Sequence, residues 1–243
     1  MPHKFDYGFL AISAITLSLI GAALVLPLTL YKSTPPWSLA WRKQLIGALL
    51  ALICISGILA ALFPDKCSKT FHSRKRKKTQ NLKVKNLNPS MESVHFRGHH
   101  PDCGNFDAHI IRLNRRVLCA ACTGLLFGGV LVLAGTASYF FLEVNFLGKP
   151  GLWSVLAGQI GIVLGFFQFK FKGFTRSFMN TLFVFSCFLV LVGVDALAEN
   201  LLIDLYLICL IIFWLFTRIL LSQWDHLQIC RRCKIPCELA FAA

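Results

Sequence analysis

The sequence predicts an all-α membrane protein: a polytopic bundle of about six transmembrane helices with a short Cys/His-rich segment in the cytosol. Three observations predict it. The apolar residues fall in long blocks, the Lys and Arg residues gather between alternate blocks, and the Cys and His residues gather in polar segments. Of the 243 residues, 56% are hydrophobic and only 15% are charged, whereas soluble domains are about 45–50% apolar and about 25% charged.

Each apolar block is long enough to cross a bilayer, which takes about 20 mainly apolar residues. We expect the spans at residues 9–31, 45–63, 120–142, 152–169, 178–198 and 201–221. The first is too long for a signal-peptide core, and no clear small-residue cleavage site follows it. Two glycine pairs, Gly124 with Gly128 and Gly161 with Gly165, are typical of helices whose backbones pack closely in lipid.

The basic residues orient the chain. The run Arg-Lys-Arg-Lys-Lys occupies residues 74–78, and Lys170, Lys172 and Arg176 follow the fourth span. Lys and Arg collect in cytoplasmic loops, so we expect a multi-pass protein of the cell membrane with both termini in the cytosol. This arrangement predicts three parts: a two-helix transmembrane hairpin at 1–64, a basic cytosolic linker at 65–97, and a four-helix transmembrane domain at 98–243.

The net charge of +14 also bears on partners. In a soluble chain it would suggest nucleic acid. In a membrane protein, Lys and Arg that collect in the cytoplasmic loops account for the positive net charge. The basic linker is also suited to binding anionic lipid head groups. We therefore expect the lipid bilayer and its anionic head groups as partners, and we do not expect nucleic acid.

Cysteine is abundant, with ten residues, and six of them lie in two polar segments that also contain histidine. Disulfides are rare in the reducing cytosol, so metal ligation is the better interpretation. The candidate ligands are His99, His100, Cys103, His109, Cys119, Cys122, His226, Cys230, Cys233 and Cys237.

The spacing of these residues favours zinc. Cys119 and Cys122 form a C-x-x-C pair at the start of the third span, where a helix N-terminus favours thiolate. Cys230 and Cys233 form a second pair, and the predicted topology places both pairs on one membrane face. Two such pairs suit a tetrahedral site with four sulfur ligands. The remaining candidates are ligands for a second metal ion or alternates for the first.

Several functions remain open. A structural zinc site is the leading hypothesis; the alternatives are a metalloenzyme or redox protein with an iron–sulfur cluster or a catalytic dithiol, and a transporter or metal sensor. No P-loop, G-x-S-x-G, H-E-x-x-H or kinase motif is present, so enzymatic activity is undecided. A transporter is less favoured, because the spans hold almost no polar residues apart from Gln159, Gln168 and Asn180. We expect Asp195 and Glu199 to be solvated at the outer end of the fifth span.

The stretch from His99 to Gly124 ends in Leu-Cys-Ala-Ala-Cys-Thr-Gly at residues 118–124. It resembles a family of uncharacterised small prokaryotic membrane proteins in which a His/Cys segment precedes a Cys-Ala-x-Cys-Thr-Gly motif at the start of a transmembrane helix. The resemblance covers about residues 95–135. It implies a Cys/His site at this helix start and implies no particular reaction.

Overall fold

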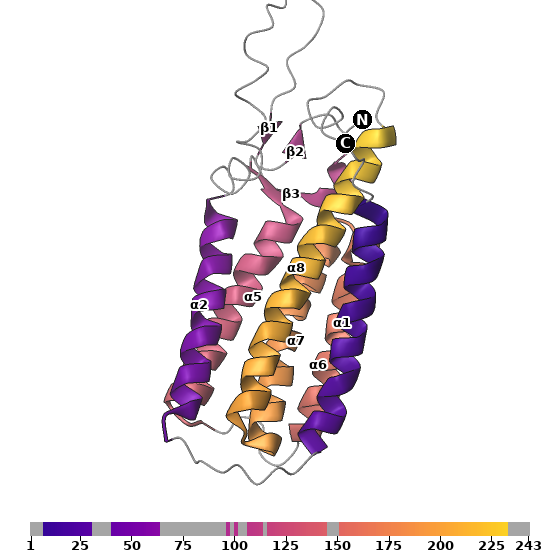
Figure 1. The fold of residues 1–243 in the computed structure, drawn as a ribbon. Coiled ribbons are helices and arrows are strands. Elements are labelled where there is room, and N and C mark those ends of the chain that lie inside the picture. The colour runs from indigo at the N-terminus through magenta and orange to yellow at the C-terminus, as the bar shows by residue number, and fades with distance from the viewer. Residues whose placement is uncertain are drawn as a thin grey trace, which may run out of the picture.

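The computed structural model is a bundle of long helices with short β-hairpins at one end (Figure 1). It describes residues 7–30, 40–63, 96–97, 100–101, 106–113, 116–144 and 151–232. The long helices are α1 (Tyr7–Leu30), α2 (Arg42–Leu62), α5 (Ala120–Thr136), α6 (Gly151–Phe166), α7 (Gly173–Ala198) and α8 (Leu201–Arg232). A π-helix, η2 (Ala137–Phe141), extends α5, and a 3-10 helix, η3 (Phe167–Lys170), extends α6. The predicted all-α bundle is confirmed.

Two small antiparallel hairpins precede α5. In the first, β1 (Phe96–Arg97) pairs with β2 (His100–Pro101). In the second, β3 (Ile110–Leu113) follows the short helix η1 (Asp107–His109) and pairs with β4 (Arg116–Cys119). The sequence analysis did not predict these strands, since elements of two to four residues are too short to show an alternating pattern.

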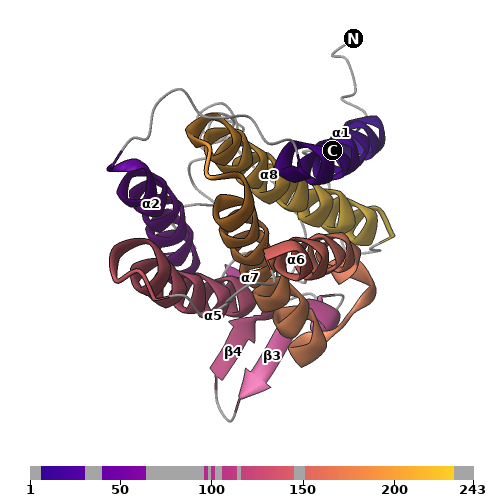
Figure 2. The ribbon, with the colours of Figure 1, turned by 90° about the horizontal axis from the view of Figure 1, so that it is seen from below.

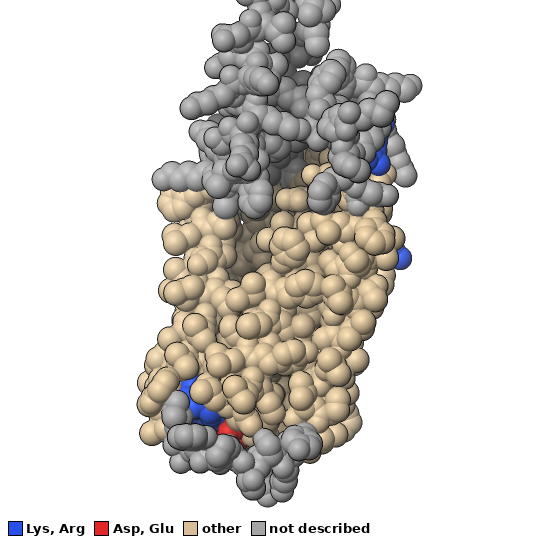
Figure 3. Space-filling view, viewed as in Figure 1, with Lys and Arg blue, Asp and Glu red and all other residues tan. Residues whose placement is uncertain are grey.

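Six helices of the described chain are long and apolar enough to cross a membrane, as predicted. Their outward side chains are apolar: Phe9, Trp153 and Leu202 are 74%, 72% and 75% exposed. On the face in Figure 3, the central part of the described surface carries no Lys, Arg, Asp or Glu, and the charged residues lie towards the ends. Such a surface is stable only against hydrocarbon. The chain is therefore an integral membrane protein that contacts the lipid bilayer.

Helix α7 lies at the centre of the bundle, packed against both α5 and α6 (Figure 2). The glycine pairs make these contacts, as predicted. A Cβ added at Gly128 of α5 would lie 2.9 Å from Cβ of Val184, and one added at Gly165 of α6 would lie 2.5 Å from Cδ2 of Phe183. The absence of side chains at these positions is what lets the neighbouring backbones approach α7.

The first two helices lie in different parts of the bundle: α1 packs against α8, and α2 against α5. Polar side chains join α1 to α8, where Ser18 Oγ lies 2.9 Å from Thr217 Oγ1, and Trp214 Nε1 donates a 3.2 Å hydrogen bond to the Ser18 carbonyl. The division of the chain into the three predicted parts stays a prediction.

The helices alternate in direction, so the bundle has two distinct ends (Figure 1). We call the end that carries β1–β4 the hairpin end; α1 begins there and α8 finishes there. We call the other end, where α7 passes into α8, the turn end. The candidate ligands that the structure describes lie at the hairpin end, which makes this end the location of the candidate functional site.

Candidate functional site

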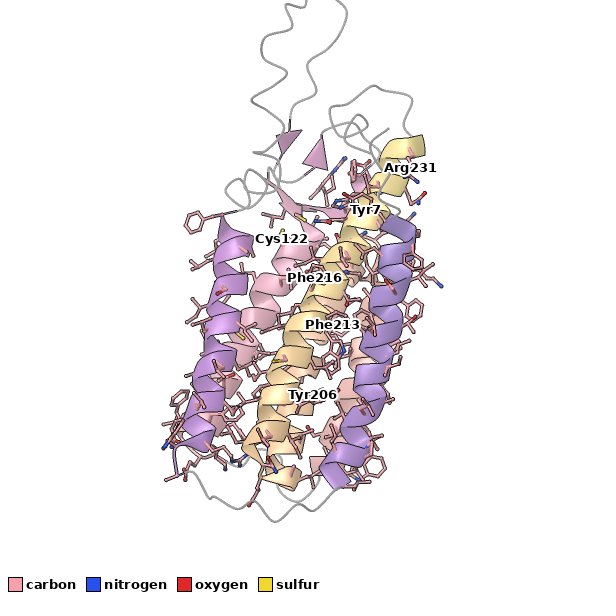
Figure 4. All side chains as sticks on the ribbon, in the orientation of Figure 1. Tyr7, Cys122, Tyr206, Phe213, Phe216 and Arg231 are labelled. Atoms are coloured by element: carbon pink, nitrogen blue, oxygen red, sulfur yellow. The ribbon has the colours of Figure 1, made fainter. Side chains whose placement is uncertain are left out.

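Cys119 and Cys122 lie where a strand passes directly into a helix. β4 ends at Cys119, which takes the N-cap position of α5 with extended dihedral angles (φ −71°, ψ 121°). Cys122 therefore falls in the first turn, at the hairpin end of α5 (Figure 4). Both side chains are half-buried. The first turn of a helix presents N–H groups with no partner inside the helix, and these favour a negatively charged group beside them.

A buried cation, Arg218 of α8, faces this cysteine pair. Its side chain is only 3% exposed, and its Nε donates a 2.7 Å hydrogen bond to Oδ1 of Asn180. No carboxylate of the described residues forms an ion pair with it. Cys122 and Cys119 lie close enough for a negative charge on either one to stabilise this guanidinium. A buried charge is costly without a counter-charge, and a thiolate at this pair would supply one.

A second buried arginine, Arg176 of α7, connects the hairpin to α8. Its Nη1 lies 3.1 Å from Nε2 of His109, and its Nη2 donates a 3.2 Å hydrogen bond to Oδ2 of Asp225. Arginine can only donate, so Nε2 of His109 is the acceptor in this hydrogen bond. The same Nε2 lies 3.4 Å from Oδ2 of Asp225.

The two candidate histidines come from different segments and meet at this end. The rings of His109 and His226 lie 5.1 Å apart, and Phe106 packs edge-on against both, at 5.4 Å and 5.5 Å. Phe106 and His109 are buried. The prediction that the two Cys/His segments share one end of the bundle is therefore confirmed for His109 and His226.

Asn180 links the two arginines, and other polar atoms nearby have no partner. Its Nδ2 donates a 2.7 Å hydrogen bond to the Arg176 carbonyl, and its Oδ1 accepts from Arg218. Within the described residues, Nε of Arg176 and both amide atoms of Gln168 have no hydrogen-bond partner. Buried polar groups of this kind are costly, so the polar cluster at the hairpin end lowers the stability of the fold.

The structure describes only some of the predicted ligands. Cys119, Cys122, His109 and His226 have described side chains, whereas His100 and Cys230 are described through their backbones in β2 and α8. The other candidates lie outside the described residues: His99, Cys103, Cys233 and Cys237. Within the described part of the chain, no group of three or more His, Cys, Asp or Glu residues is placed to hold a metal ion. The four-sulfur site stays a prediction.

Two arginines of this cluster were missed by the sequence analysis. Arg176 was expected in a basic cytosolic loop, but it is the fourth residue of α7 and is 1% exposed. Arg218 lies within the sixth predicted span, and no role was predicted for it. The sequence does carry a signal at this position, because an arginine inside an apolar segment indicates a buried polar partner or a function. The expectation that the spans hold almost no polar residues beyond three amides is therefore wrong.

A second buried polar cluster lies at the turn end. Arg42 Nη1 lies 2.7 Å from Oδ1 of Asp195 and also contacts Asp204. The hydroxyl of Tyr139 donates a 2.8 Å hydrogen bond to Oδ2 of Asp195. Both carboxylates are 0% exposed. The expectation that Asp195 is solvated is therefore wrong, because α2, η2 and α8 close over it.

Comparison of the chain with known protein families, with curated proteins and with solved structures found no match.

Proposed function

We propose that this integral membrane protein holds a structural zinc ion at its hairpin end, with Cys119 and Cys122 as two of the ligands. The observation that carries the proposal is the position of both thiols at the first turn of α5, facing the buried Arg218. Zinc binds cysteine as thiolate, and two thiolates bring two negative charges. The helix N-terminus and the guanidinium offset that charge before any metal binds.

A tetrahedral site needs two further ligands. We infer that Cys230 and Cys233 supply them. His226, which lies one helical turn before Cys230 on α8, contacts His109 just before the β3–β4 hairpin. This contact supports a position for the end of α8 beside the hairpin. His109 already accepts a hydrogen bond from Arg176, which makes it a poorer candidate than the cysteines.

Metal analysis of the full-length protein tests the proposal. Protein purified in a mild detergent without chelators should contain about one zinc ion per chain. The double change Cys119→Ser and Cys122→Ser should remove the zinc, leave the protein inserted in the membrane, and lower its thermal stability markedly, since zinc sites contribute on the order of 10 kcal/mol to folding. Cys209→Ala removes an exposed thiol of α8 and should change neither value. Zinc that persists in the double variant would contradict the proposal.

A dithiol redox centre is the second candidate. It is favoured by the position of the pair, because a cysteine pair at a helix N-terminus is also the arrangement of reactive dithiols. In that case the protein contains no zinc, and mild oxidation links Cys119 to Cys122, which mass spectrometry of alkylated peptides detects. An iron–sulfur cluster would differ from both by its visible absorption and its iron and sulfide content.

We further propose that the hairpin end faces the cytosol. The beginning of α1, the end of α2 and the end of α8 share this end (Figure 1), so the positively charged segments that follow from the sequence adjoin one face of the membrane. The basic linker between α2 and β1 would then meet anionic lipid head groups. This orientation also places the cysteines in a reducing compartment, which suits zinc ligation.

A further inference from the structure

In the cluster at the turn end, two carboxyl groups contact a single guanidinium group. Asp195, near the end of α7, and Asp204, at the start of α8, are both 0% exposed. One guanidinium nitrogen, Nη1 of Arg42, serves both carboxyl groups. The amine of Lys43 lies 5.3 Å from the centroid of the Tyr139 ring, and no ion pair joins it to either carboxyl group within the described residues. If both aspartates are ionised, two buried negative charges share one cation, and the cluster keeps a net negative charge.

The hydrogen bonds leave one oxygen on each carboxyl group unsatisfied. Nη1 of Arg42 donates to Oδ2 of Asp204, and Tyr139 donates to Oδ2 of Asp195. Oδ1 of Asp204 accepts no hydrogen bond, and Oδ1 of Asp195 makes a charge contact with Arg42 without a hydrogen bond. Both oxygens are buried, so water does not compensate them, and each is costly to leave in this state.

The two carboxyl groups lie beside each other, because the same Nη1 of Arg42 contacts an oxygen of each. An ionised carboxylate can only accept hydrogen bonds, so two ionised groups repel at this distance. A single shared proton removes this repulsion, because the protonated carboxyl group donates a hydrogen bond to the ionised one. The pair then carries one negative charge instead of two. The remaining negative charge is balanced by Arg42. A metal cation suits the position less well, since the guanidinium of Arg42 already contacts both carboxyl groups.

We propose that Asp195 and Asp204 form a proton-binding site in which the two carboxyl groups share one proton. The site joins α7 to α8 at the turn end, and Arg42 from α2 and Tyr139 from η2 orient it. Taking up or releasing the proton changes whether the ends of these elements attract or repel each other. The site is independent of the cysteines at the hairpin end, so the zinc proposal and this one can fail separately.

Infrared spectroscopy of the full-length protein in lipid tests the proposal. A protonated aspartic acid shows a carbonyl stretching band, apart from the carboxylate bands, that shifts in deuterium oxide. We expect this band at neutral pH, and we expect labelling with carbon-13 aspartate to shift it. Asp204→Asn should abolish it, because the amide donates to Asp195 in place of the proton. Asp195→Asn should abolish it equally, which provides a second variant if the first does not fold.

Glu199→Gln is the matched control, because Glu199 is an exposed carboxylate four residues after Asp195. It should leave the band unchanged. The proposal is overturned if the unaltered protein shows no protonated aspartate at neutral pH. It is also overturned if the band survives in both single asparagine variants, since the proton would then reside on another carboxyl group.

Discussion

At the scale of single residues, the hairpin end depends on one amide. Asn180 is fully buried, accepts a hydrogen bond from Arg218 and donates one to the carbonyl of Arg176. It is the only acceptor to which the structure assigns a hydrogen bond from Arg218 within the described chain. Since Arg218 faces the cysteine pair, Asn180 also fixes where that positive charge lies.

Replacing Asn180 with leucine should therefore destabilise the protein. The side chain keeps roughly its volume, but Nε of Arg218 loses its acceptor in a buried environment. The cost of such an unpaired group is about 1–3 kcal/mol, and thermal unfolding in detergent should detect it. Thr136→Val is the control: Thr136 is equally buried, but its hydroxyl donates only to Val132 of its own helix. Equal losses of stability in the two variants would show that Asn180 has no special role.

The position of the cysteine pair could be predicted from the sequence, but its surroundings could not. The C-x-x-C spacing at the start of an apolar block located Cys119 and Cys122 at a helix N-terminus. The partners of a helical residue depend on how each helix is rotated about its axis, and a nearly uniform apolar block gives little information about that rotation. Arg176, Arg218 and Asn180 therefore emerged as one network only in three dimensions.

At the scale of elements, the bundle is organised by glycine contacts with α7. A Cβ at Gly128 would meet Cβ of Val184 at 2.9 Å and the carbonyl oxygen of Thr181 at 3.3 Å. The second of these atoms belongs to the backbone and cannot turn away, so a methyl group there must push α5 from α7. By contrast, an added Cβ at Gly57 of α2 has no atom within 4 Å.

Gly128→Ala should therefore destabilise the protein, whereas Gly57→Ala should not. Overpacking at Gly128 should cost about 1–3 kcal/mol. At Gly57 the same change should be neutral or stabilise α2 by up to about 1 kcal/mol, because alanine is the better helix former. Thermal unfolding of the two variants in one detergent provides the comparison. Equal changes in thermal stability for the two variants would contradict the close contact between α5 and α7 at Gly128.

The ends of the elements show where sequence patterns lose their predictive value. The fifth span was expected from residue 178, but α7 begins at Gly173, because the first residues of the helix include Arg176, which interrupts the apolar pattern. The sixth span was expected to end at residue 221, but α8 continues to Arg232. Hydropathy predicts where a chain crosses hydrocarbon, and a helix is free to continue beyond that boundary.

At the scale of the whole molecule, two polar clusters occupy opposite ends of one apolar bundle. The cluster at the hairpin end contains buried arginines and thiols, whereas the cluster at the turn end contains paired carboxyl groups and one arginine. Helix α8 contributes to both, through Asp204 at its start and Arg218 further along. The orientation of the bundle in the membrane therefore decides which compartment each cluster faces.

Labelling of single introduced cysteines should establish that orientation. Asp107 at the hairpin end has a side chain that is 63% exposed, and Val144 after η2 at the turn end is 43% exposed. In sealed right-side-out vesicles, a membrane-impermeant maleimide should label Val144→Cys and spare Asp107→Cys, because the positive-inside rule predicts that the hairpin end faces the cytosol. Inverted vesicles should reverse the pattern, and unaltered protein gives the background from native cysteines.

Replacing Asp107 removes only a surface ion pair with Arg112, a contact worth at most about 1 kcal/mol, so the fold should be retained. Labelling of both positions from one side would contradict the six-span arrangement, whereas a complete reversal would place the cysteines outside and disfavour the zinc proposal.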